Sequence, residues 1–375
     1  MSVMGSKTKV LFFLVSLGGG GAERTCVNII NNLDRSKFEP VLVLGTADDA
    51  RYIDLLCDDV KVIVLGAPRL RYVFMKLLRC IRKEQPDLLF TTMTHNNVML
   101  LVVKMFLPEK IPIVVREANH WLGSNQIPTL AKWVVKFAYN HLADSIIALS
   151  KGVKRDLVEK FGIRDSKITV IYNPVEVKTI QQLACEPLQL DDHSQGKTVL
   201  AVGRLVESKD YVTLLRAFAL VTQHVRARLV VLGEGQLEQQ LKQLCSKLGI
   251  EDRVWFLGFK HNPYKYMRNA DLFVLTSQFE GFGHVIVEAM AVGTPVIATD
   301  CKSGPGEIIE DNKYGLLVPV GDHRALAERI ISVLENEDLR NGLKLAGSKR
   351  ALDFDAIRIT MLYEELFLDA VNGCV

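Results

Sequence analysis

Short apolar runs alternate with segments of helical periodicity along most of the chain. In the first half, strand-like runs occupy residues 10–15, 40–44, 60–64, 88–91, 113–115, 145–148 and 168–171, and the helical segments between them include 22–33 and 69–83. The pattern restarts in the second half with runs at 198–203, 228–232, 254–257, 272–275 and 295–298. Such alternation is typical of parallel sheets covered by helices. The sequence therefore predicts an α/β fold with two doubly wound, Rossmann-like domains.

A less regular stretch separates the two halves. Residues 176–197 contain Pro187 and a polar cluster, so we interpret them as a linker. With 375 residues, the chain exceeds what one hydrophobic core usually supports. We therefore expect an N-terminal domain at 1–175, a second domain at 198–352 and a C-terminal helical segment at 353–375. Ligands of doubly wound sheets bind beyond the carboxyl ends of the strands, here in a cleft between two facing domains.

The most informative loop follows the fourth predicted strand of the second half. Gly281 and Gly283 indicate a tight turn, and a helical pattern begins near His284. Backbone N–H groups in such a turn, at the positive end of a helix, favour an anion. Glu280 precedes this turn, and Glu288 lies in the second turn of the predicted helix. Two carboxylates therefore flank a predicted phosphate site.

Two cations follow the first strand of the second half. Arg204 comes directly after Gly203, and Ser208 is typical of a helix N-cap, which places Lys209 in the first turn of the predicted helix. A cation there faces the positive end of the helix dipole, so an anionic partner is expected. A diphosphate suits both the planar guanidinium and the compact ammonium group. The alternative is an ordinary surface ion pair with a neighbouring acid.

Together these motifs resemble those of a known enzyme family. Glu280 and Glu288 match the E-x7-E motif of retaining glycosyltransferases of the GT-B fold, family GT4. The segments 18–24, 202–209 and 289–300 follow in the family's order, and the resemblance covers nearly the whole chain. It implies two Rossmann-like domains, with the C-terminal helix crossing back onto the first domain. It also implies a retaining, metal-independent hexosyltransferase that takes a nucleotide diphosphate sugar as donor and requires no cofactor.

The resemblance also implies roles for individual residues. Arg204 and Lys209 would stabilise the departing diphosphate, and Glu280 would contact the hydroxyls of the transferred sugar. A vicinal diol presents two donors, so Glu288 suits the ribose. Many family members keep a sugar-contacting histidine in the loop after the fifth strand. The candidate catalytic residues are Arg204, Lys209, Glu280 and His120. The candidate donor-binding residues are Gly19, Gly20, Gly203, Phe259, Gly281, Phe282, Gly283, His284, Val285 and Glu288.

One assignment stays open, and two further motifs are weak. The residues around His120 depart from the commoner pattern of the family, so either Glu117 or His120 fills the sugar-contacting position. The four-glycine loop that includes Gly19 and Gly20 matches a dinucleotide fingerprint only loosely, so a nicotinamide cofactor is not expected. The DxD sequence ending at Asp355 fits helix capping better than metal binding, so no metal site is predicted.

The first half of the chain carries more Lys and Arg than Asp and Glu. In the helical segment at 69–83, an apolar stripe is accompanied by six cations, namely Arg69, Arg71, Lys76, Arg79, Arg82 and Lys83. Such a helix suits an anionic membrane surface or a lipid pyrophosphate. The alternative is that the stripe packs on its own sheet and the cations are solvated. The aromatic residues at 129–139 are expected to lie mostly in the core.

The sequence also limits the cellular compartments and the classes of partner that we expect. No apolar run is long enough to span a membrane, the N-terminus lacks a secretory pattern, and the seven cysteines are scattered. We expect a cytoplasmic protein with reduced thiols, peripheral on the inner face of the cell membrane. No nucleic-acid-binding motif is present.

The predicted reaction is transfer of a hexosyl or N-acetylhexosaminyl group from a nucleotide diphosphate sugar to a glycan or lipid-linked acceptor. The segment 301–309 resembles bacterial transferases that handle UDP-linked N-acetylhexosamines, which favours UDP. Two alternatives remain: a catalytically silent sugar-nucleotide-binding partner subunit, and a nucleotide-sugar epimerase of the same fold.

Overall fold

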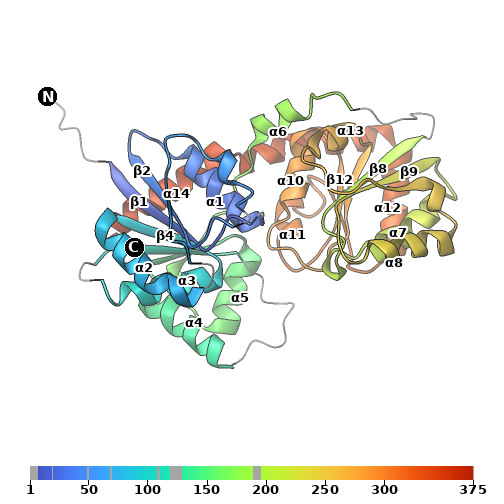
Figure 1. Cartoon of the computed structure of the whole chain (residues 1–375). Coiled ribbons are helices and arrows are strands. Elements are labelled where there is room, and N and C mark those ends of the chain that lie inside the picture. Colours follow the sequence, from blue (N-terminus) through green and yellow to red (C-terminus); the bar gives the residue numbers. More distant parts are fainter. Residues whose placement is uncertain are drawn as a thin grey trace. The chain divides into compact units, whose positions relative to one another are not determined.

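The computed structural model describes residues 7–18, 20–48, 50–67, 70–107, 110–118, 129–188 and 196–374. The chain divides into two compact units. The first comprises Met1–Pro174 with Ala356–Val375, and the second comprises Val175–Asp355. Each unit contains one parallel sheet with helices on both faces (Figure 1). The prediction of two doubly wound sheets is therefore confirmed.

The first unit is built on a seven-stranded sheet in the order β3-β2-β1-β4-β5-β6-β7. Its strands are β1 (Thr8–Leu14), β2 (Phe38–Leu44), β3 (Lys61–Val64), β4 (Leu88–Thr92), β5 (Ile113–Glu117), β6 (Ser145–Ala148) and β7 (Ile168–Val170). The helices α1 (Gly21–Asn32) and α14 (Ala356–Val371) pack against each other on one face. The helices α2 (Leu70–Glu84), α3 (Thr94–Lys104), α4 (Thr129–His141) and α5 (Lys151–Phe161) form the other layer. The predicted strands and helices of this half are confirmed to within a few residues.

The C-terminal helix completes the core of the first unit. Phe367 on α14 is fully buried, and its ring lies 5.5 Å from that of Phe90 on β4 and 6.2 Å from that of Phe12 on β1. Each buried aromatic ring removes a large apolar area from water. The expected return of the C-terminal helix to the first domain therefore has a physical basis in this cluster.

The second unit is built on a six-stranded sheet in the order β10-β9-β8-β11-β12-β13. Its strands are β8 (Lys197–Val202), β9 (Ala227–Leu232), β10 (Val254–Phe256), β11 (Leu272–Leu275), β12 (Val296–Thr299) and β13 (Leu316–Val318). Its helices are α6 (Val177–Leu183), α7 (Tyr211–Val221), α8 (Glu238–Leu248), α9 (Tyr264–Arg268), α10 (His284–Ala291), α11 (Pro305–Ile309), α12 (His323–Glu335) and α13 (Glu337–Ala351). Strand β13 was not predicted. Helix α6 lies inside the stretch that the sequence suggested to be irregular.

Candidate functional site

The predicted donor-binding residues of the second half gather at the carboxyl edge of the second sheet. From β8 the chain proceeds outward to β9 and β10 and then crosses to β11 on the other side of β8. The strand order therefore reverses between β8 and β11, which is where doubly wound sheets bind their ligands. Arg204 and Lys209 follow β8, and Glu280 follows β11.

Lys209 and Glu280 form an ion pair between these two loops. The Nζ atom of Lys209 donates to Oε1 of Glu280, and only 19% and 13% of the two side chains are exposed. The hydroxyl of Ser277 donates to the same carboxylate oxygen at 2.7 Å. The sequence placed both residues at the site but did not anticipate that they would pair. Partial burial strengthens the pair because fewer water molecules screen it.

The local structure around Lys209 differs from the prediction. Residues Glu207–Lys209 form a 3-10 turn, and the N-cap of α7 is Asp210, whose carboxylate accepts from the Thr213 N–H at 3.2 Å and from its hydroxyl at 2.8 Å. The prediction of Ser208 as N-cap, with Lys209 inside the first turn, is therefore wrong. Asp210 takes the cap because its carboxylate reaches two donors and because aspartate tolerates the left-handed φ of +46°.

Backbone contacts hold the β8 and β11 loops together. The Thr276 hydroxyl donates to the carbonyl oxygen of Lys209 at 2.9 Å, and the Gln278 N–H donates to that of Ser208 at 2.8 Å. The loop after β9 packs against the opposite side of the β8 loop, where a Cβ at Gly233 would lie 2.0 Å from the carbonyl oxygen of Gly203. Only glycine allows this approach. Gly233 was not predicted as a site residue, although a Gly-x-Gly run directly after a strand indicates such a close loop contact.

Arg204 and Phe259 lie at the exposed rim of the same edge. Arg204 is exposed directly after β8, and Phe259 follows β10 with 59% of its surface exposed. The Phe259 N–H donates to Oε1 of Glu234 at 3.2 Å, and its ring meets that of His261 edge to face at 5.1 Å. The structure thus brings an exposed aromatic ring and a cation to the same edge as the Lys209–Glu280 pair.

The glycine loop and α10 follow the prediction closely. Gly283 caps α10 with φ of +98°, and the helix begins at His284 as expected. The Phe282 ring is buried and packs 5.3 Å from the ring of Phe354, so this residue offers its backbone rather than its ring. Glu288 lies in the second turn of α10 and is only 3% exposed. Gly281 and Val285 are partly buried.

The loop after β12 packs against the glycine loop at residues 281–283. The Ser303 hydroxyl donates to the carbonyl oxygen of Glu280 at 2.5 Å. Gly304 has φ of +81°, and a Cβ there would lie 2.2 Å from the carbonyl oxygen of Phe282. Burial, and secondarily the nearby Glu280 carboxylate, raise the pKa of the Cys301 thiol to about 12. The segment that suggested a donor type at the sequence level therefore also holds the site in place.

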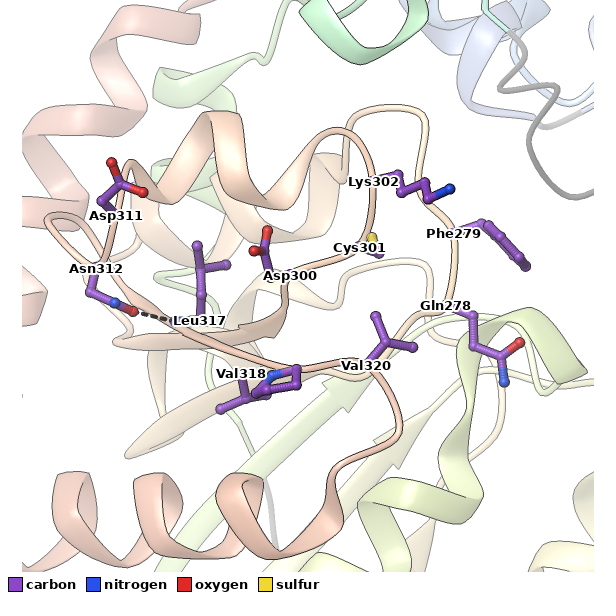
Figure 2. A pocket seen from close by; sticks show the side chains of 11 residues that line it. Gln278, Phe279, Asp300, Cys301, Lys302, Asp311, Asn312, Leu317, Val318 and Val320 are labelled. Carbon is purple, nitrogen blue, oxygen red and sulfur yellow. Dashed lines mark hydrogen bonds between the residues drawn. The ribbon is translucent and has the colours of Figure 1, made fainter. Parts of the chain in front are cut away.

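A cavity of about 780 Å³ opens beside this loop, at the carboxyl ends of β11, β12 and β13. Figure 2 shows Lys302 and Phe279 on one side of the cavity and Asp311 and Asn312 on the other, with Asp300 between them. Phe279, which lines this cavity, directly precedes Glu280 in the sequence.

Comparison with known proteins identifies the family. The model of the glycosyl transferases group 1 matches residues 189–350, and that of Glycosyltransferase Family 4 matches residues 19–179. N-acetylgalactosamine-N,N'-diacetylbacillosaminyl-diphospho-undecaprenol 4-alpha-N-acetylgalactosaminyltransferase of Campylobacter jejuni is 33% identical over 94% of this chain and 97% of its own length. The chain belongs to glycosyltransferase family 4.

Two further likenesses bear on this glycosyltransferase. A second Campylobacter jejuni protein, an alpha-1,4-N-acetyl-D-galactosaminyltransferase named for a GalNAc-containing diNAcBac-PP-undecaprenol, is 26% identical over 97% of this chain and 99% of its own length. HepE of Anabaena, crystallised with UDP, is 24% identical over 96% of this chain and 100% of its own, with a TM-score of 0.80. The structural likeness shows that the expected GT-B fold is correct.

The site residues that were predicted in the first unit are less completely described. Gly19 and His120 lie outside the described residues, and Gly20 is the exposed N-cap residue of α1. Glu117 is fully buried at the end of β5, where its carboxylate accepts from the Tyr139 hydroxyl at 2.8 Å and from the Thr94 hydroxyl at 2.9 Å. Glu117 is thus held by buried hydrogen bonds in this glycosyltransferase, and the choice between Glu117 and His120 as the sugar-contacting residue stays a prediction.

The buried polar cluster around Glu117 extends to Arg116. Arg116 is 1% exposed, and it donates to the Thr92 hydroxyl at 2.9 Å and to the side-chain oxygen of Asn173. Burial, and then the neighbouring Glu117 carboxylate, raise the pKa of Tyr139 well above its usual value, so its hydroxyl stays a donor. The cluster fixes the ends of β4 and β5 in the glycosyltransferase.

Helix α2 separates into a packed and an exposed face. Val73, Leu77 and Ile81 are fully buried, so the apolar stripe packs within the first unit, as the alternative interpretation held. Among the predicted cations, Arg69 and the side chain of Arg71 lie outside the described parts. Lys76 donates to the carbonyl oxygens of Leu65 and Gly66, and Arg82 donates to that of Phe106, whereas Arg79 and Lys83 are exposed.

The thiols, the DxD sequence and the helices of the glycosyltransferase bear on disulfides, metal binding and membrane spans. All seven cysteines are unpaired, and Cys26, Cys80, Cys245 and Cys301 are buried. Asp353 of the DxD sequence pairs with Arg350 at 3.0 Å. Within the described residues, no group of three or more His, Cys, Asp or Glu side chains is placed to hold a metal ion. No helix in the described ranges has the length and apolar character needed to cross a bilayer.

Proposed function

We propose that the protein is a retaining, metal-independent transferase that moves a hexosyl or N-acetylhexosaminyl group from a UDP-linked sugar to a lipid-linked acceptor. The observation that carries this proposal is the Lys209–Glu280 pair at the point where the strand order of the second sheet reverses. Membership of glycosyltransferase family 4 supports the transfer reaction. The undecaprenol-linked acceptor in the name of the Campylobacter relative supports the acceptor class, and the UDP in the HepE crystals supports the donor.

The geometry supports a role for charge in breaking the sugar–phosphate bond. Negative charge accumulates on the diphosphate as it leaves, and cations already in position stabilise that charge without reorganising. Arg204 and Lys209 supply them. Glu280 pairs with Lys209 in the structure, and an incoming phosphate competes for the same ammonium group. The displaced Glu280 carboxylate then accepts hydrogen bonds from hydroxyls of the transferred sugar. We assign neither Glu280 nor Glu288 a covalent role.

The other end of the donor fits the same edge of the sheet. Glu288, buried at the second turn of α10, offers two oxygens to the paired ribose hydroxyls. The exposed ring of Phe259 offers a flat face to the base. Backbone N–H groups of residues 281–285 at the start of α10 bind phosphate, as helix N-termini do. The family resemblance keeps His120 as the candidate that contacts the transferred sugar.

The acceptor belongs to the first unit in this proposal. Residues 69–83 bring cations to an anionic membrane surface or to the pyrophosphate of a lipid-linked acceptor, where each nearby cation contributes about 1 kcal/mol. Because the apolar stripe of α2 is buried, this contact is electrostatic. We place the protein at the cytoplasmic face of the membrane, where nucleotide sugars are made.

The test is steady-state transfer from UDP-sugars to a lipid-linked acceptor, with release of UDP as the readout. We expect Arg204→Ala and Lys209→Ala each to lower kcat by about a hundredfold or more, the usual loss when one group that stabilises developing charge is removed. Lys247→Ala, an exposed position on α8, is the matched control. Undiminished turnover in folded Arg204→Ala and Lys209→Ala would refute the assignment.

Two outcomes separate this proposal from the alternatives. A wild-type protein that binds UDP-sugars but neither hydrolyses nor transfers them would be a silent partner subunit. Conversion of the free nucleotide sugar to its epimer without an acceptor would identify an epimerase. Retention is read from the anomeric configuration of the product, and metal independence from unchanged turnover in a chelator.

A further inference from the structure

Helix α4 is apolar on two opposite faces. Val135, Ala138 and Tyr139 are buried on its inner face. The outer face exposes four apolar side chains, which we call the α4 ridge: Leu130, Trp133, Val134 and Phe137, exposed by 74%, 66%, 39% and 44%. The sequence predicted that the aromatic residues at 129–139 would lie mostly in the core. The structure shows that this expectation is wrong for Trp133 and Phe137.

The ridge is a preformed surface rather than a set of scattered side chains. Trp133 and Phe137 are one helical turn apart, and their rings stack with centroids 5.9 Å apart and planes within 9°. Phe137 also contacts the ring of His141, the last residue of the helix, at 5.0 Å. Contiguous exposed apolar surface of this kind usually marks a binding site for a partner or a membrane.

Positive charge accompanies the ridge. Lys132 and Lys136 are both exposed on α4, and no Asp or Glu occurs within the helix. Helix α3 lies between α4 and α2 in the same layer (Figure 1), and α2 exposes Arg79, Lys83, Tyr72 and Met75. The outer side of this layer thus combines aromatic, aliphatic and cationic side chains, the composition of surfaces that lie in a membrane interface.

We infer that the α4 ridge inserts into the interfacial zone of an anionic lipid bilayer and anchors the first unit there. The inference rests on the proposed function, in which the acceptor is lipid-linked. Helix α2 buries its apolar stripe and exposes only Tyr72 and Met75 as large apolar side chains, so its cations attract an anionic surface mainly within about a Debye length, roughly 10 Å. The ridge supplies the larger, contiguous apolar surface.

Charge also decides between a lipid surface and a second copy of the chain. A symmetric dimer contact through the ridge places the same patch on both partners. Lys132 and Lys136, on the flank of the ridge, would then add four positive charges beside the contact with no acid on α4 to balance them. An anionic bilayer satisfies both the rings and the lysines.

The test measures co-sedimentation with vesicles of equal parts phosphatidylcholine and phosphatidylglycerol, with no donor or acceptor present. The double variant Trp133→Gln with Phe137→Gln is expected to bind about tenfold more weakly, the order of effect when two partly exposed aromatics no longer leave water. Leu345→Gln, at a 61% exposed apolar position on α13, is the matched control and is expected to bind like the wild type. All three proteins should share one melting temperature, since the changed side chains are exposed.

A second readout tests insertion directly. The chain has three tryptophans, so replacing Trp121 and Trp255 with Phe leaves Trp133 as the reporter. Brominated lipids are expected to quench it on vesicle binding, with a blue shift of its emission. Equal vesicle binding by the double variant, or an unquenched Trp133, overturns the inference. So does a dimer that the double variant abolishes while vesicle binding persists, since that outcome assigns the ridge to a second copy.

These readouts are separate from catalysis. Donor turnover in detergent with a short-chain acceptor should be the same in the ridge variant and the wild type. Loss of turnover in Lys209→Ala together with intact vesicle binding would support both proposals. Intact vesicle binding of a wild type that transfers nothing would refute the proposed function alone.

Discussion

At the residue scale, the position of the Glu280 carboxylate depends on two donors, the Lys209 ammonium and the Ser277 hydroxyl. Ser277 is fully buried, and its own carbonyl oxygen accepts from the Thr299 hydroxyl at 2.6 Å, so its place is fixed by β12. A phosphate that draws Lys209 away leaves Ser277 as the group that orients Glu280. Ser277 therefore acts in catalysis through Glu280 in this scheme.

We expect Ser277→Ala to lower kcat for sugar transfer by about tenfold, the cost of losing one hydrogen bond to a charged group. The KM for the UDP-sugar should change less, because the cations that bind the diphosphate remain. Ser246→Ala, on the exposed face of α8, serves as the control. A variant with full kcat would show that Ser277 has only a structural role.

Cysteine reactivity gives a second prediction at the residue scale. Burial raises the pKa of the Cys301 thiol to about 12, so at pH 8 almost none of it is the reactive thiolate. The exposed Cys57, Cys185 and Cys374 should be alkylated by iodoacetamide at that pH, while Cys301 reacts only after unfolding. Because folding raises the pKa of this thiol above its ordinary value of 9.0, its stabilising contribution is complete below pH 9 and is lost as the pH rises towards 12. Peptide mass mapping before and after denaturation is the measurement.

At the element scale, the loops at the sheet edge position one another through backbone contacts. Gly304 lies against the carbonyl of Phe282, and Gly233 lies against that of Gly203. Each contact joins the loop of one strand to the loop of another. A side chain at either glycine would move a loop that carries donor-binding groups.

We expect Gly304→Ala to weaken UDP binding by at least about tenfold, because its Cβ would lie 2.2 Å from the carbonyl oxygen of Phe282 and displace the loop at 281–283. Gly249→Ala is the matched control, since that glycine also has positive φ, +67°, but no atom within 4 Å of an added Cβ. Both variants carry the backbone strain of a left-handed alanine, so calorimetric titration with UDP isolates the contact. Equal affinities would show that the loop tolerates the shift.

The sequence predicted most of the elements because their apolar periods are long enough to recognise. It missed β13, only three residues between Gly315 and Pro319, because so short a run has no measurable period. It placed the N-cap at Ser208 rather than Asp210, since choosing between two capping residues requires knowing which carboxylate or hydroxyl reaches Thr213. It also expected the aromatic residues at 129–139 to lie mostly in the core, because an apolar pattern on both faces of a helix does not reveal which face is exposed.

Some features of the candidate site could likewise be predicted from the sequence, and others could not. Glycines, the two glutamates and the two cations could be found from their spacing, because phosphate binding requires backbone N–H groups and cations at strand ends. The Lys209–Glu280 pair, the Ser303 contact and the burial of Glu117 depend on which loops are neighbours across the sheet. Those relations follow from strand order, which a linear pattern does not contain.

At the scale of the whole molecule, the two units are related by an insertion. The first unit is completed by α14, whose Phe367 and Tyr363 close the aromatic cluster over Phe12 and Phe90. The second unit is continuous in sequence from Val175 to Asp355. Its two ends are joined to each other, because the Val175 N–H donates to the carbonyl oxygen of Phe354 at 2.9 Å and Val175 bridges to Asp355.

A segment whose ends meet and whose core is its own should fold when excised. We therefore expect residues 175–355, expressed alone, to unfold cooperatively and to bind UDP with an affinity within about tenfold of that of the full chain, because the proposed diphosphate and ribose contacts lie within it. The measurement is the rise of melting temperature with UDP concentration, and Lys209→Ala in the same segment should abolish that rise. A folded segment without any UDP-dependent shift, beside a full chain that shows one, would place an essential part of the donor site in the first unit. A chain truncated after Asp355 lacks only α14. Its first unit should lose stability, whereas the melting temperature of its second unit should still rise with UDP concentration.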